Sequence, residues 1–248
     1  MAQQKGIFKV KGMLGDVSFY QSKDGYLIRE KTSLDGKRIA TDPAFIRTRE
    51  NSAEFSRGAR SGKLVRNAFR HLIKDASDSL VVSRLTRMMI ECLRLDSTHV
   101  RGERTVLENI TYIKGFDFNN NAKLSSTLYV PYQAAVDKTT GELGVNMEAY
   151  RATAAILAPQ GTTHYQLHVA GALLNFDDLT FEARFTDGAV LAYDQTEQSA
   201  GSLSVALTPG SVNPYMLVMG ITFSQEVNGE HYALKNGVYN ALSLVEVK

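Results

Sequence analysis

The sequence predicts an α+β fold, in which an N-terminal β-hairpin and a helical region precede a C-terminal antiparallel β-sandwich. Short β-prone runs around an Asp-Gly step occupy residues 6–31, and apolar residues at helical spacing follow. Beyond residue 115, β-branched and aromatic runs alternate with turn signals roughly every 8–15 residues. This change of texture predicts a hairpin and basic helical domain over residues 1–116 and a sandwich domain over residues 117–248.

The N-terminal strands are expected on both sides of the turn Lys23-Asp24-Gly25. Residues 17–20 and 26–29 are β-prone, and an Asp-Gly step between such runs is a strong hairpin signal. A lone hairpin is marginal in water, so we expect residues 1–40 to contact a partner surface. Two partners remain open: a neighbouring copy of the chain, or the chain's own sandwich.

Two helices are predicted, over residues 44–72 and 79–95. Pro43 suits a first helical position, which places the helix onset near Asp42. Gly58 and Gly62 weaken the first helix by about 1 kcal/mol each relative to Ala, and they permit close packing against another backbone. The single cysteine, Cys92, is expected as a small buried apolar residue of the second helix.

The second half is expected to be rich in short strands. Turn signals stand between them, and residues 147–157 fit either a short helix or a loop. The predicted turns are Asp177-Asp178, Asp187-Gly188, Pro209-Gly210, Asn228-Gly229 and Asn236-Gly237. The predicted strands are residues 127–133, 144–147, 163–174, 179–185, 189–193, 202–207, 216–223, 231–234 and 241–247.

Motifs for common catalytic and metal chemistries are absent from the sequence. With one cysteine there is no intramolecular disulfide and no CxxC zinc pair, and no Walker, dinucleotide, HExxH or GxSxG motif occurs. His164 and His168 share one face of a predicted strand, but they lie about 13 Å apart, too far to chelate one metal directly. We therefore expect no enzyme, no catalytic residue, no metal and no cofactor, unless residues far apart in the sequence meet in space.

Charge is divided unevenly along the chain. Residues 1–116 hold 22 Lys and Arg against 13 Asp and Glu, a balance of +9, and residues 117–248 hold 6 against 13, a balance of −7. Such asymmetry suggests contact with nucleic acid or complementary contact between subunits.

The basic stretch from Arg47 to Arg70 has three interpretations. It could bind phosphates, form a solvated helix face with internal pairs such as Arg47–Glu50 and Glu54–Arg57, or dock onto an acidic surface of a neighbouring copy.

Neither a secretory signal nor a membrane span is predicted from the sequence. The first twenty residues lack an apolar segment and a cleavage site, and no run approaches the ~18 apolar residues of a spanning helix. We expect cytoplasmic synthesis without a signal peptide, no membrane partner, and membership of a particle or other assembly as one destination.

Several strings resemble those of a family of proteins common in Bacteroidota that has no assigned activity. Near the N-terminus they are GDVSFY at 15–20, DGYLIREK at 24–31, TDPAF at 41–45, RTREN at 47–51 and EF at 54–55. Near the C-terminus they are GITF at 220–223, QEVNG at 225–229 and residues 232–242. The resemblance implies kinship over the whole chain and carries no catalytic residue across.

These observations favour a non-enzymatic structural subunit of a homo-oligomer or larger particle, with copies of itself and other subunits as partners. A nucleic-acid-associated protein that uses the helix of residues 44–72 and an enzyme with an unrecognised site are the alternatives. The candidate interaction residues are Phe19, Tyr20, Tyr26, Arg29, Arg47, Arg49, Arg57, Arg60, Lys63 and Arg66.

Overall fold

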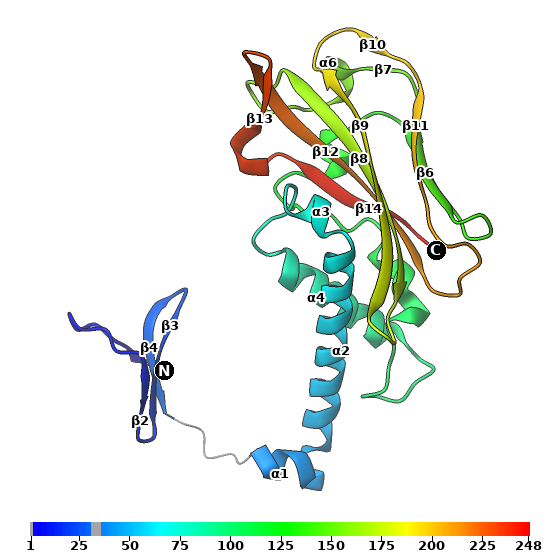
Figure 1. Ribbon diagram of the computed structural model, residues 1–248. Coiled ribbons are helices and arrows are strands. Elements are labelled where there is room, and N and C mark those ends of the chain that lie inside the picture. The colour runs from blue at the N-terminus through cyan, green and yellow to red at the C-terminus, as the bar shows by residue number, and fades with distance from the viewer. Residues whose placement is uncertain (1, 31–35) are drawn as a thin grey trace. The chain divides into compact units, whose positions relative to one another are not determined.

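The computed structural model describes residues 2–30 and 36–248, apart from the side chains at 235 and 236, and divides the chain into two compact units (Figure 1). The units are Met1–Arg49 and Glu50–Lys248, so residue 116, where the sequence texture changes, lies inside the second unit. Helices and antiparallel sheets, including a curled half-barrel, confirm the mixed α and β character that the sequence predicts.

The first unit contains a small antiparallel sheet with strand order β1-β4-β3-β2. Its central strands pair with Phe19 opposite Ile28, and Leu14 on the edge strand lies opposite Val17. The unit continues into short helical segments, and none of its residues that the structure describes is buried. The elements are β1 (Ala2–Gln3), β2 (Gly12–Leu14), β3 (Val17–Ser22), β4 (Gly25–Glu30), α1 (Gly36–Thr41) and η1 (Pro43–Phe45).

The long helix α2 (Ile46–Ala68) follows a cap at the predicted onset. The Asp42 carboxylate accepts a hydrogen bond from the backbone N–H of Ala44 at 2.9 Å, which satisfies one of the donors that a helical N-terminus leaves open. Arg49 then donates to the carbonyls of Ile39 and Asp42 at 2.8 and 2.9 Å.

Helix α2 packs closely against helix α4 (Val81–Leu95) in the second unit. A Cβ added at Gly58 would lie 2.9 Å from Ile90 Cγ1, and one added at Gly62 would lie 3.6 Å from the Thr86 backbone nitrogen. The predicted close approach at the two glycines is therefore confirmed. Cys92 lies buried in α4, as expected, and burial raises the pKa of its thiol to about 12.

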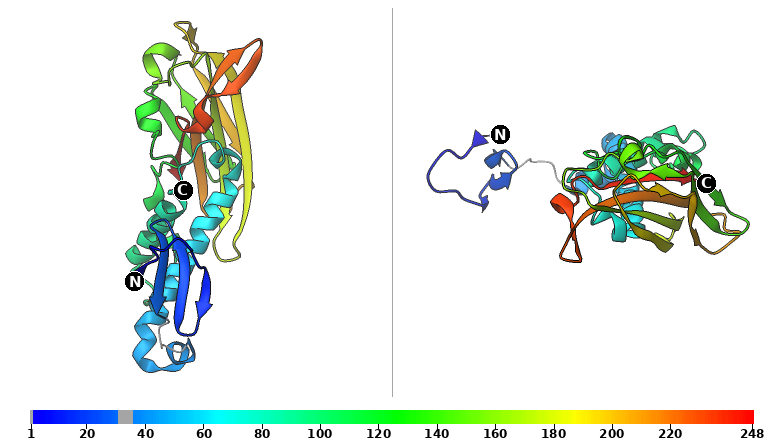
Figure 2. Two further views of the ribbon diagram at one scale, coloured as in Figure 1. Left: turned by 90° about the vertical axis from the view of Figure 1, so that its left-hand side faces the viewer. Right: turned by 90° about the horizontal axis from the view of Figure 1, so that it is seen from above.

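The remaining elements of the second unit form two larger sheets, one small pair and short helices (Figure 2). A five-stranded sheet has the order β13-β12-β8-β9, with β14 also paired to β12, and a three-stranded sheet has the order β11-β6-β5. The five-stranded sheet consists of β8 (His164–Asn175), β9 (Thr180–Ala192), β12 (Tyr215–Val227), β13 (Glu230–Ala233) and β14 (Ala241–Val247). The other strands are β5 (Tyr132–Asp137), β6 (Glu142–Met147), β11 (Gly201–Ala206), β7 (Tyr150–Arg151) and β10 (Glu197–Gln198). The short helices are α3 (Arg70–Ile73), η2 (Leu107–Ile113), α5 (Leu124–Thr127), α6 (Ala152–Ala155) and η3 (Leu234–Gly237).

Apolar side chains on opposite faces of the five-stranded sheet belong to two different cores. On one face Ala170, Ala172 and Met216 join the core of the helices, whose largest side chains include Phe69 and Leu85. On the other face the sheet shares a second core with the three-stranded sheet. Successive residues of a strand point to opposite faces, which explains how β8 and β12 are buried on both sides and read as nearly continuous apolar runs.

Two sequence predictions for the second unit, one strand and one turn, are wrong. Residues 127–133 were expected as one strand, but α5 ends at Thr127 and β5 begins only at Tyr132. The start of α5 is fixed by the Asp117 carboxylate, which accepts a hydrogen bond from the Leu124 N–H at 3.2 Å.

The second error concerns Asp187-Gly188, which was expected as a turn between two strands. Strand β9 runs through this step without interruption, and the register to β8 shifts between Gln166 and His168 as a β-bulge. The Gly188 carbonyl accepts a hydrogen bond from Gln166 Nε2 at 2.8 Å, so the step is held inside the sheet.

Candidate functional site

A cavity of about 610 Å³ opens on the helix-facing side of the five-stranded sheet, beside the segment that follows α3. Three histidines from separate elements lie in its wall: His71 in α3, His168 in β8 and His231 in β13. The side of the cavity near α3 is tied to the sheet by buried Asn240, which donates to the Asp75 carbonyl at 2.8 Å.

A hydrogen-bond chain crosses three strands in the wall of this cavity. His168 Nδ1 lies 2.6 Å from Asp187 Oδ1, and His168 Nε2 lies 2.9 Å from Thr222 Oγ1. The histidine is buried, whereas the Asp187 side chain is about half exposed. Hydroxyl, imidazole and carboxylate stand in the order found in the catalytic triads of hydrolases, and the same contacts also satisfy a buried imidazole.

Strand register explains why these three side chains meet. His168 lies opposite Gly220 on one side and Asp187 on the other, and Thr222 stands two residues beyond Gly220 on the same face of β12. Residues two positions apart across paired strands are diagonal neighbours, so His168 reaches Thr222 past Gly220.

A second cluster at the rim of the cavity contains His164, Glu226 and His231. One imidazole nitrogen from each histidine and one carboxylate oxygen of Glu226 all lie within 4.8 Å of one another. His164 Nε2 is 3.5 Å from Glu226 Oε2, and the rings of His164 and His231 are 4.6 Å apart, nearly perpendicular at 77°. Glu226 and His231 are exposed and His164 is half-buried, so solvent reaches the group.

The turn Asn228-Gly229 positions two of the three residues of this cluster, Glu226 and His231. Both residues have positive φ, 55° and 84°, as a two-residue type I′ turn requires, and the turn joins β12 directly to β13. Glu226 is thereby placed opposite His231. Val227 and Glu230, which close such a turn, form a hydrogen-bonded pair. Glu226 and His231 are therefore a non-hydrogen-bonded pair, in which the two side chains stand closer together.

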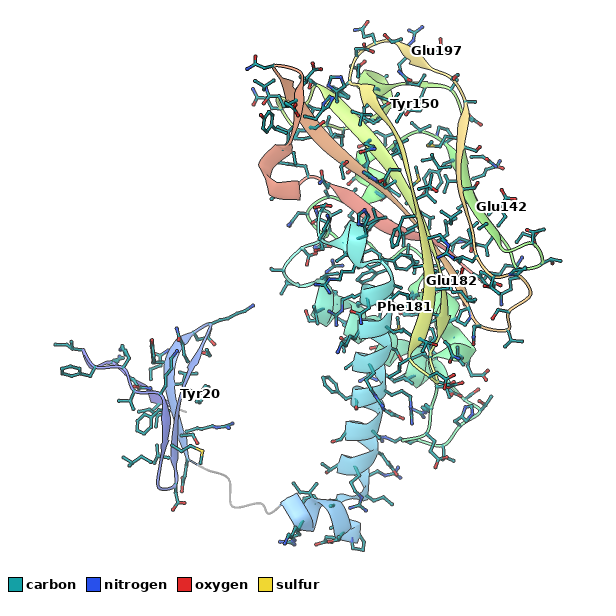
Figure 3. All side chains as sticks on the ribbon, viewed as in Figure 1. Tyr20, Glu142, Tyr150, Phe181, Glu182 and Glu197 are labelled. Atoms are coloured by element: carbon teal, nitrogen blue, oxygen red, sulfur yellow. The ribbon has the colours of Figure 1, made fainter. Side chains whose placement is uncertain are left out.

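The candidate interaction residues of the first unit divide between the two faces of its sheet. The Arg29 guanidinium lies 5.4 Å from the centre of the Tyr20 ring, and Lys11 Nζ lies 5.6 Å from the centre of the Tyr26 ring. Phe19 shares the face of Tyr26 by register, and Tyr20, which is labelled in Figure 3, belongs to the opposite face. Aromatic rings and cations therefore stand on both faces of this sheet.

The basic residues of α2 do not form one free surface. Arg57 donates from Nη1 to the carbonyls of Gly102 and Arg104 and so holds that loop against the helix. Arg60 and Lys63 are exposed, whereas Arg66 is half-buried. Arg47 and Arg49 belong to the first unit, where Arg49 is used in the cap described above.

Sequence reasoning missed both histidine clusters for identifiable reasons. A turn at Asp187-Gly188 would separate Asp187 from the strand that pairs with His168, so the sequence does not predict their contact. Spacing within one strand relates His164 only to His168, not to residues of other strands. The string EVNGEH does predict part of the second cluster. A two-residue turn at Asn228-Gly229 pairs Glu226 with His231 across the hairpin. The turn expected at Asp177-Asp178 is confirmed, because Asn175 Oδ1 accepts hydrogen bonds from both backbone N–H groups at 3.0 Å.

Comparison of the chain with protein-family models, curated proteins and solved structures found no match. Within the described residues, no helix combines the length and the apolar character needed to cross a membrane.

Proposed function

We propose that the chain is a non-enzymatic subunit that assembles with copies of itself through its first unit. In this proposal the second unit is a sandwich-like scaffold. One observation carries the proposal: the first unit has no buried residue in its described part, although one face of its sheet gathers Leu14, Val17, Phe19 and Ile28. A sheet with an apolar face is stable only when that face is covered.

Exposed apolar side chains next to the sheet add to this uncovered surface. In the segment between β1 and β2, Ile7 and Phe8 are 96% and 89% exposed, and Leu14 on the apolar face itself is 74% exposed. Single exposed apolar residues are ordinary, but a group of them on a unit without a core marks an interaction surface.

Charge favours a second copy as the partner. Residues 1–49 hold ten Lys and Arg and five Asp and Glu, a balance of +5, which leaves −3 for residues 50–248 from the total of +2. Contact of the first unit of one copy with the second unit of another joins opposite charges. Such a contact is heterologous, so it generates rings or open filaments rather than two-fold dimers.

Light scattering coupled to size-exclusion chromatography tests the proposal. The full chain should form a species larger than a monomer, and a chain lacking residues 1–40 should be a folded monomer. The double variant Phe19→Ser/Ile28→Ser should also dissociate, whereas Leu27→Ser, on the opposite face of the same sheet, serves as the matched control. A full-length monomer at high concentration and low salt would exclude the proposal.

A hydrolytic enzyme is the second candidate, supported by the chain of Thr222, His168 and Asp187. If Thr222 is a nucleophile, hydrolysis of a chromogenic ester should be lost in Thr222→Val and in His168→Gln. Equal rates for the wild type and both variants would mean that these hydrogen bonds only satisfy a buried histidine and take no part in catalysis.

A phosphate-binding role would depend on exposed Arg60 and Lys63, because Arg57 already donates its hydrogen bonds within the chain.

A further inference from the structure

We propose that His164, Glu226 and His231 form a binding site for a divalent transition-metal ion of the Zn²⁺ class. The site lies at the rim of the cavity, because His231 also lines that cavity. It is independent of the assembly proposed above, since all three residues belong to the second unit.

The separations among the ligand atoms suit a tetrahedral ion. Metal bonds of about 2.0–2.2 Å to imidazole and carboxylate place neighbouring ligand atoms about 3.4 Å apart in a tetrahedron. His164 Nε2 and Glu226 Oε2 already stand 3.5 Å apart, and all three ligand atoms fit within 4.8 Å. Rotation of the exposed His231 and Glu226 side chains supplies the remaining adjustment, because both end at the protein surface.

A neighbouring hydroxyl orients two of the three ligands. His164 Nδ1 lies 3.0 Å from Thr163 Oγ1, and the Glu226 backbone N–H donates to the same oxygen at 2.7 Å. When Nδ1 donates its proton to this hydroxyl, Nε2 keeps the lone pair that faces Glu226. Metal-binding histidines usually donate their other ring N–H to such a partner, which fixes both tautomer and ring orientation.

The strands hold the ligand positions before any ion arrives. The type I′ turn fixes Glu226 opposite His231, and the β8–β12 ladder fixes His164 opposite Ser224, two residues before Glu226. The three side chains therefore stand on one face of one sheet. A preorganised site loses less free energy to ordering when it binds than a site on a flexible loop.

The ligand set selects the metal. Two imidazoles and one carboxylate suit Zn²⁺, Co²⁺, Ni²⁺ and Cu²⁺, whereas Mg²⁺ and Ca²⁺ prefer oxygen ligands alone. Three protein ligands leave at least one coordination position for water or an external ligand. Ser224 and His231 both line the cavity, so an ion bound here is within reach of a small molecule that enters it.

Isothermal titration of the untagged full chain with ZnCl₂, after removal of metal by a chelator, tests the site. We expect one Zn²⁺ per chain and a higher melting temperature with metal bound. Replacing a ligand, in His164→Ala, His231→Ala or Glu226→Gln, should weaken binding more than about 100-fold, and Thr163→Val should weaken it about 10–100-fold. Co²⁺ should give the intense visible absorption bands of a tetrahedral site.

His71→Ala is the matched control, because His71 is an exposed histidine of the same cavity outside the cluster. Its affinity for Zn²⁺ should equal that of the wild type, and circular dichroism should report folded protein for every variant. No binding at 100 µM ZnCl₂, binding that the ligand variants retain, or tighter binding of Mg²⁺ than of Zn²⁺ would each overturn the proposal.

Discussion

At the scale of single residues, Asp96 is the most strongly constrained carboxylate. Burial raises its pKa, but hydrogen bonds from the Thr105 N–H, the Thr98 hydroxyl and the backbone N–H groups of Thr98 and His99 outweigh burial and hold the pKa well below its usual range. The native state thus favours the ionised form of Asp96. Its contribution to stability is present above the unfolded-state pKa of about 3.9 and is lost as the pH falls through the lower native pKa.

Replacing this carboxylate should destabilise the protein in a way that depends on pH. Asp96→Asn should lower the midpoint of urea unfolding at pH 7, because the amide accepts fewer of these hydrogen bonds and carries no charge. The difference between wild type and variant should shrink as the pH falls below about 4, because the unfolded wild-type carboxylate then binds a proton that the native carboxylate does not. A difference that is equal at pH 7 and in acid would contradict the assigned role.

Arg57 should contribute to folding stability, which distinguishes it from the other basic residues of α2. Its guanidinium holds the carbonyls of Gly102 and Arg104, and charged hydrogen bonds of this kind contribute about 1.5–3 kcal/mol. We expect Arg57→Ala to lower the free energy of unfolding by that amount. Arg60→Ala, at an exposed position one turn further along, should change it by less than about 0.5 kcal/mol. Equal losses in the two variants would refute this distinction.

At the scale of elements, the contact between α2 and α4 gives opposite expectations for two glycines one turn apart. Gly62→Ala should stabilise the protein by up to about 1 kcal/mol, because alanine favours the helix and its methyl group meets Thr86 at an ordinary 3.6 Å. Gly58→Ala gains the same helix propensity but pushes on Ile90 Cγ1 at 2.9 Å, so it should be less stable than Gly62→Ala. Thermal unfolding of the two variants beside the wild type measures the difference.

Predictions of elements succeeded where the signal is local. The helix signals of residues 44–72 and 79–95 correspond to α2 and α4, because apolar spacing and the Asp42 cap are properties of neighbouring residues. The last predicted strand, 241–247, matches β14 at both ends. The Asp187-Gly188 step failed because an Asp-Gly pair fits a bulge as well as a turn, and only pairing with β8 decides between them.

Neither candidate site could be fully derived from local patterns. The partners Thr222, His168 and Asp187 are separated by 54 and 19 positions along the chain, and only sheet order brings them together. The pair Glu226 and His231 was within reach through the Asn-Gly turn, but His164 joins it through the long-range β8–β12 ladder. The order of strands in a sheet is a property of the whole fold, which a single sequence does not display.

At the scale of the whole molecule, the two units should differ in how they protect their backbone amides. The second unit buries two apolar cores, whereas the described residues of the first unit bury none. Amide hydrogens exchange through local opening, and opening costs little where few apolar contacts are broken. In the monomer, the amides of β2, β3 and β4 should therefore exchange fast while those of β8 and β12 stay protected.

Assembly should change this pattern in the first unit alone. If a second copy covers the face of Phe19 and Ile28, the amides of β3 and β4 gain protection as the protein concentration rises, and β8 and β12 stay unchanged. Raising the salt concentration should remove the gain, because opposite charges on the two units are screened over a Debye length of about 3 Å at 1 M. Hydrogen–deuterium exchange with mass spectrometry, measured at two protein and two salt concentrations, reads out both effects. Protection of β3 and β4 that is already complete in the monomer would mean that the face is covered within one chain.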